Sequence, residues 1–284
     1  MKGDDRPRNY WLRLALVVGV ISLSFLSVIA VLKIAAALGI AREKLHGTTL
    51  DLTPRTVVIL LGYMGTQIGI VLLVQRVVHG RPLRQLGFRG NASRDAALGF
   101  LIGVSIAGVQ TALEAVAAPT ASLHWMLPAG VSLPSFALYY SFWFCVLLTL
   151  NSLSEELMFR AYPIEHLAVD GSNGVLVLTF IAVAFSAVHN LVEPFELRSF
   201  VSRVLWAGLL TYLYDRTRSI WLICGVHNGS NFVPFTLGGN WKTGGLWELT
   251  SVDAPDATRI AIRTAVVTLA VVALHRLLPR RISS

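Results

Sequence analysis

Charged residues are scarce in this sequence. They make up 14% of its 284 residues, and hydrophobic residues make up 54%. An ordinary soluble domain has roughly 25% charged and 45 to 50% apolar residues, so this composition excludes a typical soluble protein and predicts an integral membrane protein. In such a chain the net charge of +8 favours contact with membrane lipid headgroups, and nucleic acid is the poorer partner.

Cysteines, repeats and processing signals are also few. Cys145 and Cys224 lie within apolar runs and lack metal-ligand spacing, so they are interpreted as small buried residues. The first apolar run is much longer than the core of a signal peptide and has no convincing small-residue cleavage site. We expect it to stay as a membrane anchor. No internal repeat or low-complexity segment is visible, which favours one membrane domain over residues 1–284.

Long apolar runs fill most of the chain. A bilayer core about 30 Å thick needs about 20 consecutive apolar residues in a helix. We therefore predict an all-α, polytopic membrane bundle of about eight transmembrane helices. The runs cover residues 12–40, 56–78, 95–118, 135–160, 173–190, 199–214, 219–237 and 259–278.

Lysine and arginine are distributed unevenly over the loops between these runs. The N-terminal segment, residues 76–94, residues 216–218 and residues 276–281 hold most of them, and with eight helices these segments lie on one side of the membrane. Basic loops stay preferentially on the cytoplasmic side. Both termini are therefore predicted to be cytoplasmic.

A few ionisable residues fall inside the predicted spans, where a charge needs a reason. Four of them lie within about two turns of a span end, from which a long side chain can snorkel to the interface: Lys33, Glu114, Arg203 and Arg263. The remaining polar set is compact and consists of Glu155, Glu156, Arg160, His189, His227 and Asn231.

Helical geometry divides this set. Glu156 and Arg160 are four residues apart and so share a helix face, which favours a charge-neutralising pair. Glu155 is rotated by about 100° from Glu156 and cannot share that role equally. His227 and Asn231 are also four apart. A free carboxylate, two imidazoles and an amide donor converging between helices could hydrolyse an amide bond.

Three ordered motifs carry a family resemblance. They are E-E-x-x-x-R from Glu155 to Arg160, F-x-x-x-H from Phe185 to His189, and H-x-x-x-N from His227 to Asn231. Together they resemble the CPBP family of intramembrane endopeptidases, which includes the CAAX-prenyl endopeptidases and the bacterial Abi-type proteins. The resemblance covers residues 151–231, which it marks as the catalytic core.

The resemblance implies an intramembrane protease in a bacterial inner membrane, with a peptide or protein substrate that is possibly membrane-anchored. It makes Glu155 the base that activates water, with assistance from His189. By the same resemblance Glu156 holds Arg160, whereas His227 and Asn231 stabilise the oxyanion. Proton-coupled transport and a catalytically silent scaffold of the same fold are the alternative functions.

The need for a metal stays open at this point. Glu155, His189 and His227 could form a zinc site with an open position. The H-E-x-x-H spacing is absent, however, so a mechanism without a cofactor is favoured.

Depth in the membrane poses a problem for this set. In straight parallel helices Glu155 would lie near the cytoplasmic surface and His189 much deeper. We therefore expect the segment from Tyr162 to Gly174 to be partly embedded or amphipathic, so that the fifth span begins later in the sequence.

Overall fold

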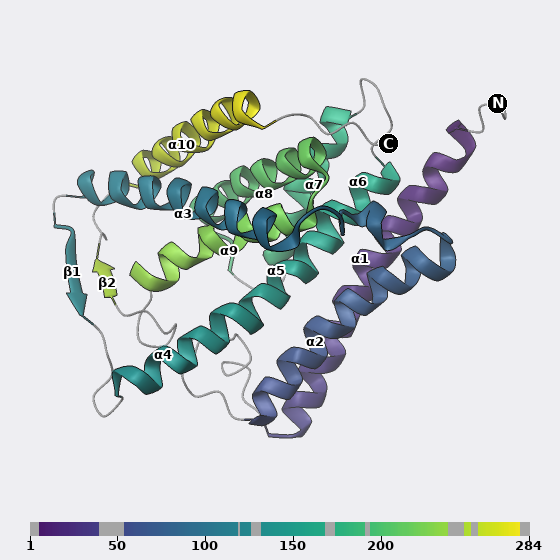
Figure 1. Cartoon of the computed structure of the whole chain (residues 1–284), viewed down its shortest axis with the longest axis horizontal. Coiled ribbons are helices and arrows are strands. Elements are labelled where there is room, and N and C mark those ends of the chain that lie inside the picture. The colour runs from purple at the N-terminus through teal and green to yellow at the C-terminus, as the bar shows by residue number, and fades with distance from the viewer. Residues whose placement is uncertain are drawn as a thin grey trace.

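The computed structural model describes residues 6–39, 54–118, 120–125, 132–167, 174–190, 194–237, 247–250 and 255–278. Long helices dominate these residues (Figure 1). The separate helices are α1 (Arg6–Ala37), α2 (Pro54–Leu73), α3 (Ala92–Val116), α7 (Gly174–His189), α8 (Leu197–Thr217), α9 (Ile220–Leu237) and α10 (Asp256–Leu277). A further long helix comprises α4 (Leu133–Phe142), α5 (Thr149–Glu156) and α6 (Tyr162–Leu167), joined by π-helical turns.

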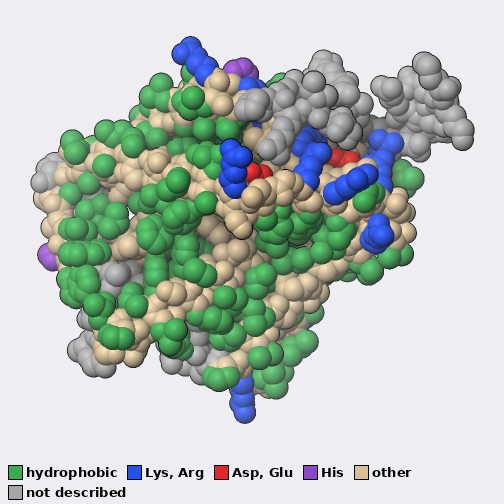
Figure 2. All heavy atoms as spheres, in the orientation of Figure 1, with side chains coloured by type: hydrophobic (Ala, Val, Ile, Leu, Met, Phe, Trp, Pro, Cys, Tyr) green, Lys and Arg blue, Asp and Glu red, His purple; other side chains and the backbone are tan. Residues whose placement is uncertain are grey.

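The predicted helical membrane bundle is confirmed. Five helical stretches of the described chain are long and apolar enough to cross a membrane: Trp11–Ala37, Val57–Val78, Ala92–Val116, Leu133–Leu167 and Asp256–Leu277. Helices α7, α8 and α9 coincide with the other three predicted runs, but the count of eight spans stays a prediction. Figure 2 shows a largely hydrophobic face, with most of its visible Lys and Arg side chains in the upper part.

One short β-ribbon was not predicted. Strand β1 (Ser122–Trp125) pairs antiparallel with β2 (Trp247–Thr250). The rings of Trp125 and Trp247 meet edge to face at 4.9 Å between centroids. Each strand has only four residues and lies far from its partner in the sequence, so neither shows a period long enough to be recognised.

Helices α3 and α9 pack against each other through glycines. Gly99 and Gly103 on α3 face Gly225 and Gly229 on α9, and a Cβ atom added at any of these would come within 2.1 to 2.2 Å of a backbone oxygen of the other helix. Such contacts lie far inside van der Waals distance, so only glycine permits them. Small residues four apart allow two membrane helices to approach at backbone distance, and this contact fixes the position of α9.

The long central helix continues past its predicted end. The predicted span 135–160 is part of an uninterrupted helix from Leu133 to Leu167, and Tyr162, Ile164 and Leu167 are buried. Residues 168–173 lie outside the described part. Helix α7 has 16 residues, fewer than the about 20 that a perpendicular span needs, and it ends at His189.

Candidate active site

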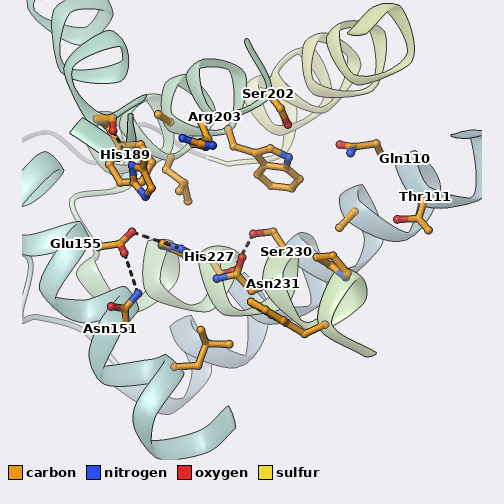
Figure 3. A pocket seen from close by; sticks show the side chains of 18 of the residues that line it. Gln110, Thr111, Asn151, Glu155, His189, Ser202, Arg203, His227, Ser230 and Asn231 are labelled. Atoms are coloured by element: carbon orange, nitrogen blue, oxygen red, sulfur yellow. Dashed lines mark hydrogen bonds and ion pairs between the residues drawn. The ribbon is translucent and has the colours of Figure 1, made fainter. Parts of the chain in front are cut away.

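A cavity of about 960 Å³ opens between the helices. Its lining includes side chains from α2, α3, α5, α7, α8, α9 and α10. Four of the predicted site residues line it: Glu155, His189, His227 and Asn231. The structure therefore brings Glu155 and His189 to one cavity despite their different predicted depths. In Figure 3, Glu155 and His227 lie toward one end of this cavity, and Gln110 and Thr111 toward the other.

Glu155 uses its two carboxylate oxygens differently. The Asn151 amide nitrogen donates a hydrogen bond to Oε1 at 2.8 Å. The second oxygen, Oε2, lies 3.8 Å from Nε2 of His227, which is too long for a direct hydrogen bond. The Glu155 side chain is 18% exposed and lines the cavity, so Oε2, the oxygen that Asn151 does not hold, can contact a molecule in the cavity.

The neighbouring Glu156 is completely buried and has two partners. Its Oε1 lies 3.2 Å from Nη1 of Arg160, whose side chain is also 0% exposed. The same oxygen lies 2.7 Å from Nδ1 of His227. Glu156 therefore links the buried arginine of its own helix to the imidazole on α9. The contact with His227 could not be read from the spacing within the first motif, because it joins two helices.

The tautomer of His227 follows from this contact. A carboxylate only accepts hydrogen bonds, so Nδ1 carries the proton that Glu156 Oε1 accepts. A neutral His227 ring then has its lone pair on Nε2, on the side of Glu155. The hydrogen bond to Glu156 also fixes the orientation of the ring.

The F-x-x-x-H motif supports the site from α7. The Phe185 ring lies under the Arg160 guanidinium, 4.0 Å from its carbon to the ring centroid. Its backbone oxygen lies 2.8 Å from Nδ1 of His189. Because a carbonyl only accepts, His189 donates from Nδ1 and has Nε2 available toward the cavity that it lines.

A buried hydrogen-bond chain clamps α5 to α9. The Ser152 hydroxyl donates to the side-chain oxygen of Asn228 at 2.6 Å, and the Asn228 amide donates to the Thr149 hydroxyl at 2.9 Å. Asn228 directly follows His227, so these hydrogen bonds fix the position of His227 relative to Glu155 and Glu156.

The far end of the cavity contains an ion pair. Arg263 on α10 lies 2.7 Å from Oε1 and 3.1 Å from Oε2 of Glu114 on α3, and it also donates to the Ser202 hydroxyl on α8 at 2.8 Å. The prediction that Glu114 and Arg263 snorkel to the interface is therefore wrong. Both side chains are satisfied inside the bundle, where each neutralises the other across three helices.

Arg203 and Lys33 are the other two residues predicted to snorkel. Arg203 lines the same cavity, whereas the side chain of Lys33 on α1 is exposed, as snorkelling requires. Two histidines outside the three motifs, His79 and His166, stack at 4.0 Å between ring centroids. They bond Tyr162 and Gln75, respectively, at 2.9 Å, and neither lines the cavity.

The donor arrangement does not fit the zinc alternative. Within the described residues, no three His, Cys, Asp or Glu side chains form a group that could hold a metal ion. Glu155, His189 and His227 line the same cavity but do not form such a group.

Comparison with known families adds to this geometry. A polytopic helical membrane protein with paired glutamates, two histidines and an asparagine around one cavity defines a candidate intramembrane hydrolase. The model of the family described as type II CAAX prenyl endopeptidase Rce1-like matches residues 134–233. The predicted resemblance to the CPBP and CAAX endopeptidases is thereby confirmed for this segment, which contains all three motifs. No curated protein and no solved structure matches the chain.

Together with the long apolar helices, this match supports an integral membrane protein with endopeptidase activity of the general CAAX type. One site residue, Asn151, was missed by sequence reasoning. Its signal was present, because Asn151 stands four residues before Glu155 and residues at that spacing share a helix face.

Proposed function

We propose that this protein is an intramembrane endopeptidase in which Glu155 activates water, without a metal, to hydrolyse a peptide bond of a membrane-anchored substrate. The observation that carries the proposal is the 3.8 Å separation between Glu155 Oε2 and His227 Nε2. Both atoms are acceptors when Glu155 is ionised and His227 is neutral. A water molecule can bridge them by donating one hydrogen bond to each.

The hydrolysis follows from this placement of water. The water oxygen forms a bond to the carbonyl carbon of the substrate while one of its protons passes to Glu155 Oε2. Asn231 follows His227 by one turn of α9, and its amide is the donor we assign to the developing oxyanion. The carbon–nitrogen bond then breaks, and the leaving amine takes the proton from Glu155. The products are a carboxylate and an amine.

The remaining residues orient or neutralise the groups that take part in this step. Glu156 orients His227 and is itself neutralised by Arg160, which does not line the cavity. His189 assists from α7, where its Nε2 can contact the water or the leaving amine. His227 thus orients water in this proposal, and Asn231 alone takes the oxyanion role that the family resemblance gave to both residues.

Hydrolysis can be tested before any substrate is identified. Purified protein in nanodiscs is added, in ¹⁸O-enriched water, to membranes of a strain that lacks the gene, and new C-termini are identified by mass spectrometry. We expect peptides whose new carboxylate carries one ¹⁸O atom, and we expect none with a His227→Ala protein. A proton-coupled transporter or a silent scaffold would yield no labelled termini, and that result would contradict the proposal.

Metal dependence is tested on the same preparation. We expect purified protein to contain less than one zinc per chain and to keep its activity after prolonged exposure to a strong chelator, because carboxylate and imidazole activate the water. The measurement is elemental analysis together with cleavage rate. Activity that is lost and returns only with added zinc or cobalt would contradict the metal-free mechanism.

The orientation in the membrane also remains a proposal. We place both termini on the cytoplasmic side of a bacterial inner membrane, on the basis of the basic loops around residues 76–94 and 216–218.

A further inference from the structure

Asn151 is outside the three motifs but contacts the proposed base directly. Its amide nitrogen lies 2.8 Å from Glu155 Oε1, and both side chains line the cavity (Figure 3). Because the carboxylate is an acceptor only, the nitrogen of the amide must face it. Asn151 therefore donates to one defined oxygen of Glu155.

The choice of oxygen matters for the geometry of the base. The last torsion of a glutamate side chain is broad and roughly two-fold, so a carboxylate without a fixed partner rotates easily. With Oε1 held by Asn151, the other oxygen, Oε2, is directed toward His227 Nε2 at 3.8 Å. The position of the bridging water thus depends on the hydrogen bond that Asn151 donates to Glu155 Oε1.

We propose that Asn151 is a positioning residue, which holds the Glu155 carboxylate so that Oε2 faces the water and His227. This inference rests on the proposed function of Glu155. Asn151 acts through that carboxylate and is not assigned a contact with the reacting atoms.

The test compares three substitutions that keep or remove the donor. Asn151→Leu keeps a side chain of similar size that branches at the same carbon, but it removes the N–H donor without adding a charge. Asn151→Ala removes both shape and donor, and Asn151→Gln retains an amide on a longer side chain. For Asn151→Ala we expect kcat to fall about 10- to 100-fold, the size of loss that misplacement of a reacting group produces, with KM nearly unchanged.

The size-matched variant separates positioning from packing. If Asn151 positions the base, Asn151→Leu falls about as far in kcat as Asn151→Ala, and Asn151→Gln recovers part of the loss. If Asn151 only fills space, Asn151→Leu keeps the activity of the natural protein, and this result would overturn the inference. Ser154→Ala is the matched control, because among the described residues the Ser154 hydroxyl donates only to the Asn151 backbone oxygen of its own helix; we expect its kcat to stay within about two-fold.

A double-mutant cycle tests whether Asn151 acts through Glu155. Glu155→Asp withdraws the carboxylate from Asn151 by one methylene, so adding Asn151→Ala to it should lower its residual kcat less than about two-fold. Losses that multiply in full would overturn the inference.

Glu155→Gln is measured in parallel to separate the two proposals. Full activity of Glu155→Gln contradicts the function of Glu155 itself. Unchanged kcat of Asn151→Leu in a protein that Glu155→Gln inactivates contradicts only the inference about Asn151.

Discussion

Replacing Glu155 by glutamine is expected to abolish cleavage and to leave the folded protein intact. Glutamine has the shape of glutamate, and its carbonyl oxygen can still accept the hydrogen bond from Asn151. It cannot take a proton from water. Loss of a general base typically costs about 10²- to 10⁴-fold in rate, so activity should fall to near the background of the assay, while the melting temperature in detergent stays that of the natural protein.

The control for this prediction is the same substitution on the surface. Glu196→Gln changes a glutamate whose side chain is 60% exposed and which lies before α8, so neither melting nor cleavage should change. Cleavage by Glu155→Gln at the natural rate would remove Glu155 as the base, whatever the outcome of the other variants.

Truncating Arg160 is expected to reduce both stability and activity. Arg160→Ala leaves the carboxylate of Glu156 completely buried without its arginine. Removing one partner of a buried ion pair typically costs about 3 to 5 kcal/mol. His227, the remaining partner of Glu156, would lose its fixed orientation as that carboxylate relaxes. A thermal melt in detergent and a cleavage assay on the same preparation measure the two effects.

Two further variants separate charge from geometry in this pair. Arg160→Lys should recover part of the stability and less of the activity, because an ammonium lacks the planar fork of the guanidinium and its stacking on Phe185. The double variant Glu156→Gln/Arg160→Met should be more stable than Arg160→Ala, because it strands no charge. Should Arg160→Ala be inactive but melt like the natural protein, Arg160 would act on substrate directly and its role as a scaffold would be wrong.

The sequence was most informative where the chemistry lies within one helix. The i, i+4 spacing of Glu156 and Arg160 predicted neighbours, and the structure places them in an ion pair. The spacing could not show that Glu156 also bonds His227 or that Glu155 lines the cavity. These contacts depend on how α5 and α9 pack and on which side chains reach the shared oxygen.

Hydropathy was least informative about charges at the ends of apolar runs. Glu114 and Arg263 each stand near a span end, where an interfacial position is the ordinary explanation. Their pairing depends on the packing of α3 against α10 beside the cavity. A hydropathy profile treats each run separately and contains no information about which runs are neighbours.

The glycine contact between α3 and α9 has a consequence for how substrate enters. A helix held at backbone distance along two successive turns cannot slide or tilt without breaking that contact, so α3 and α9 should move as one rigid body. His227 and Asn231 would then remain stationary during turnover. A bulky membrane-anchored peptide must therefore enter by displacement of other helices around the cavity. Helix α3, which carries no catalytic motif, would hold α9 in place while the cavity opens.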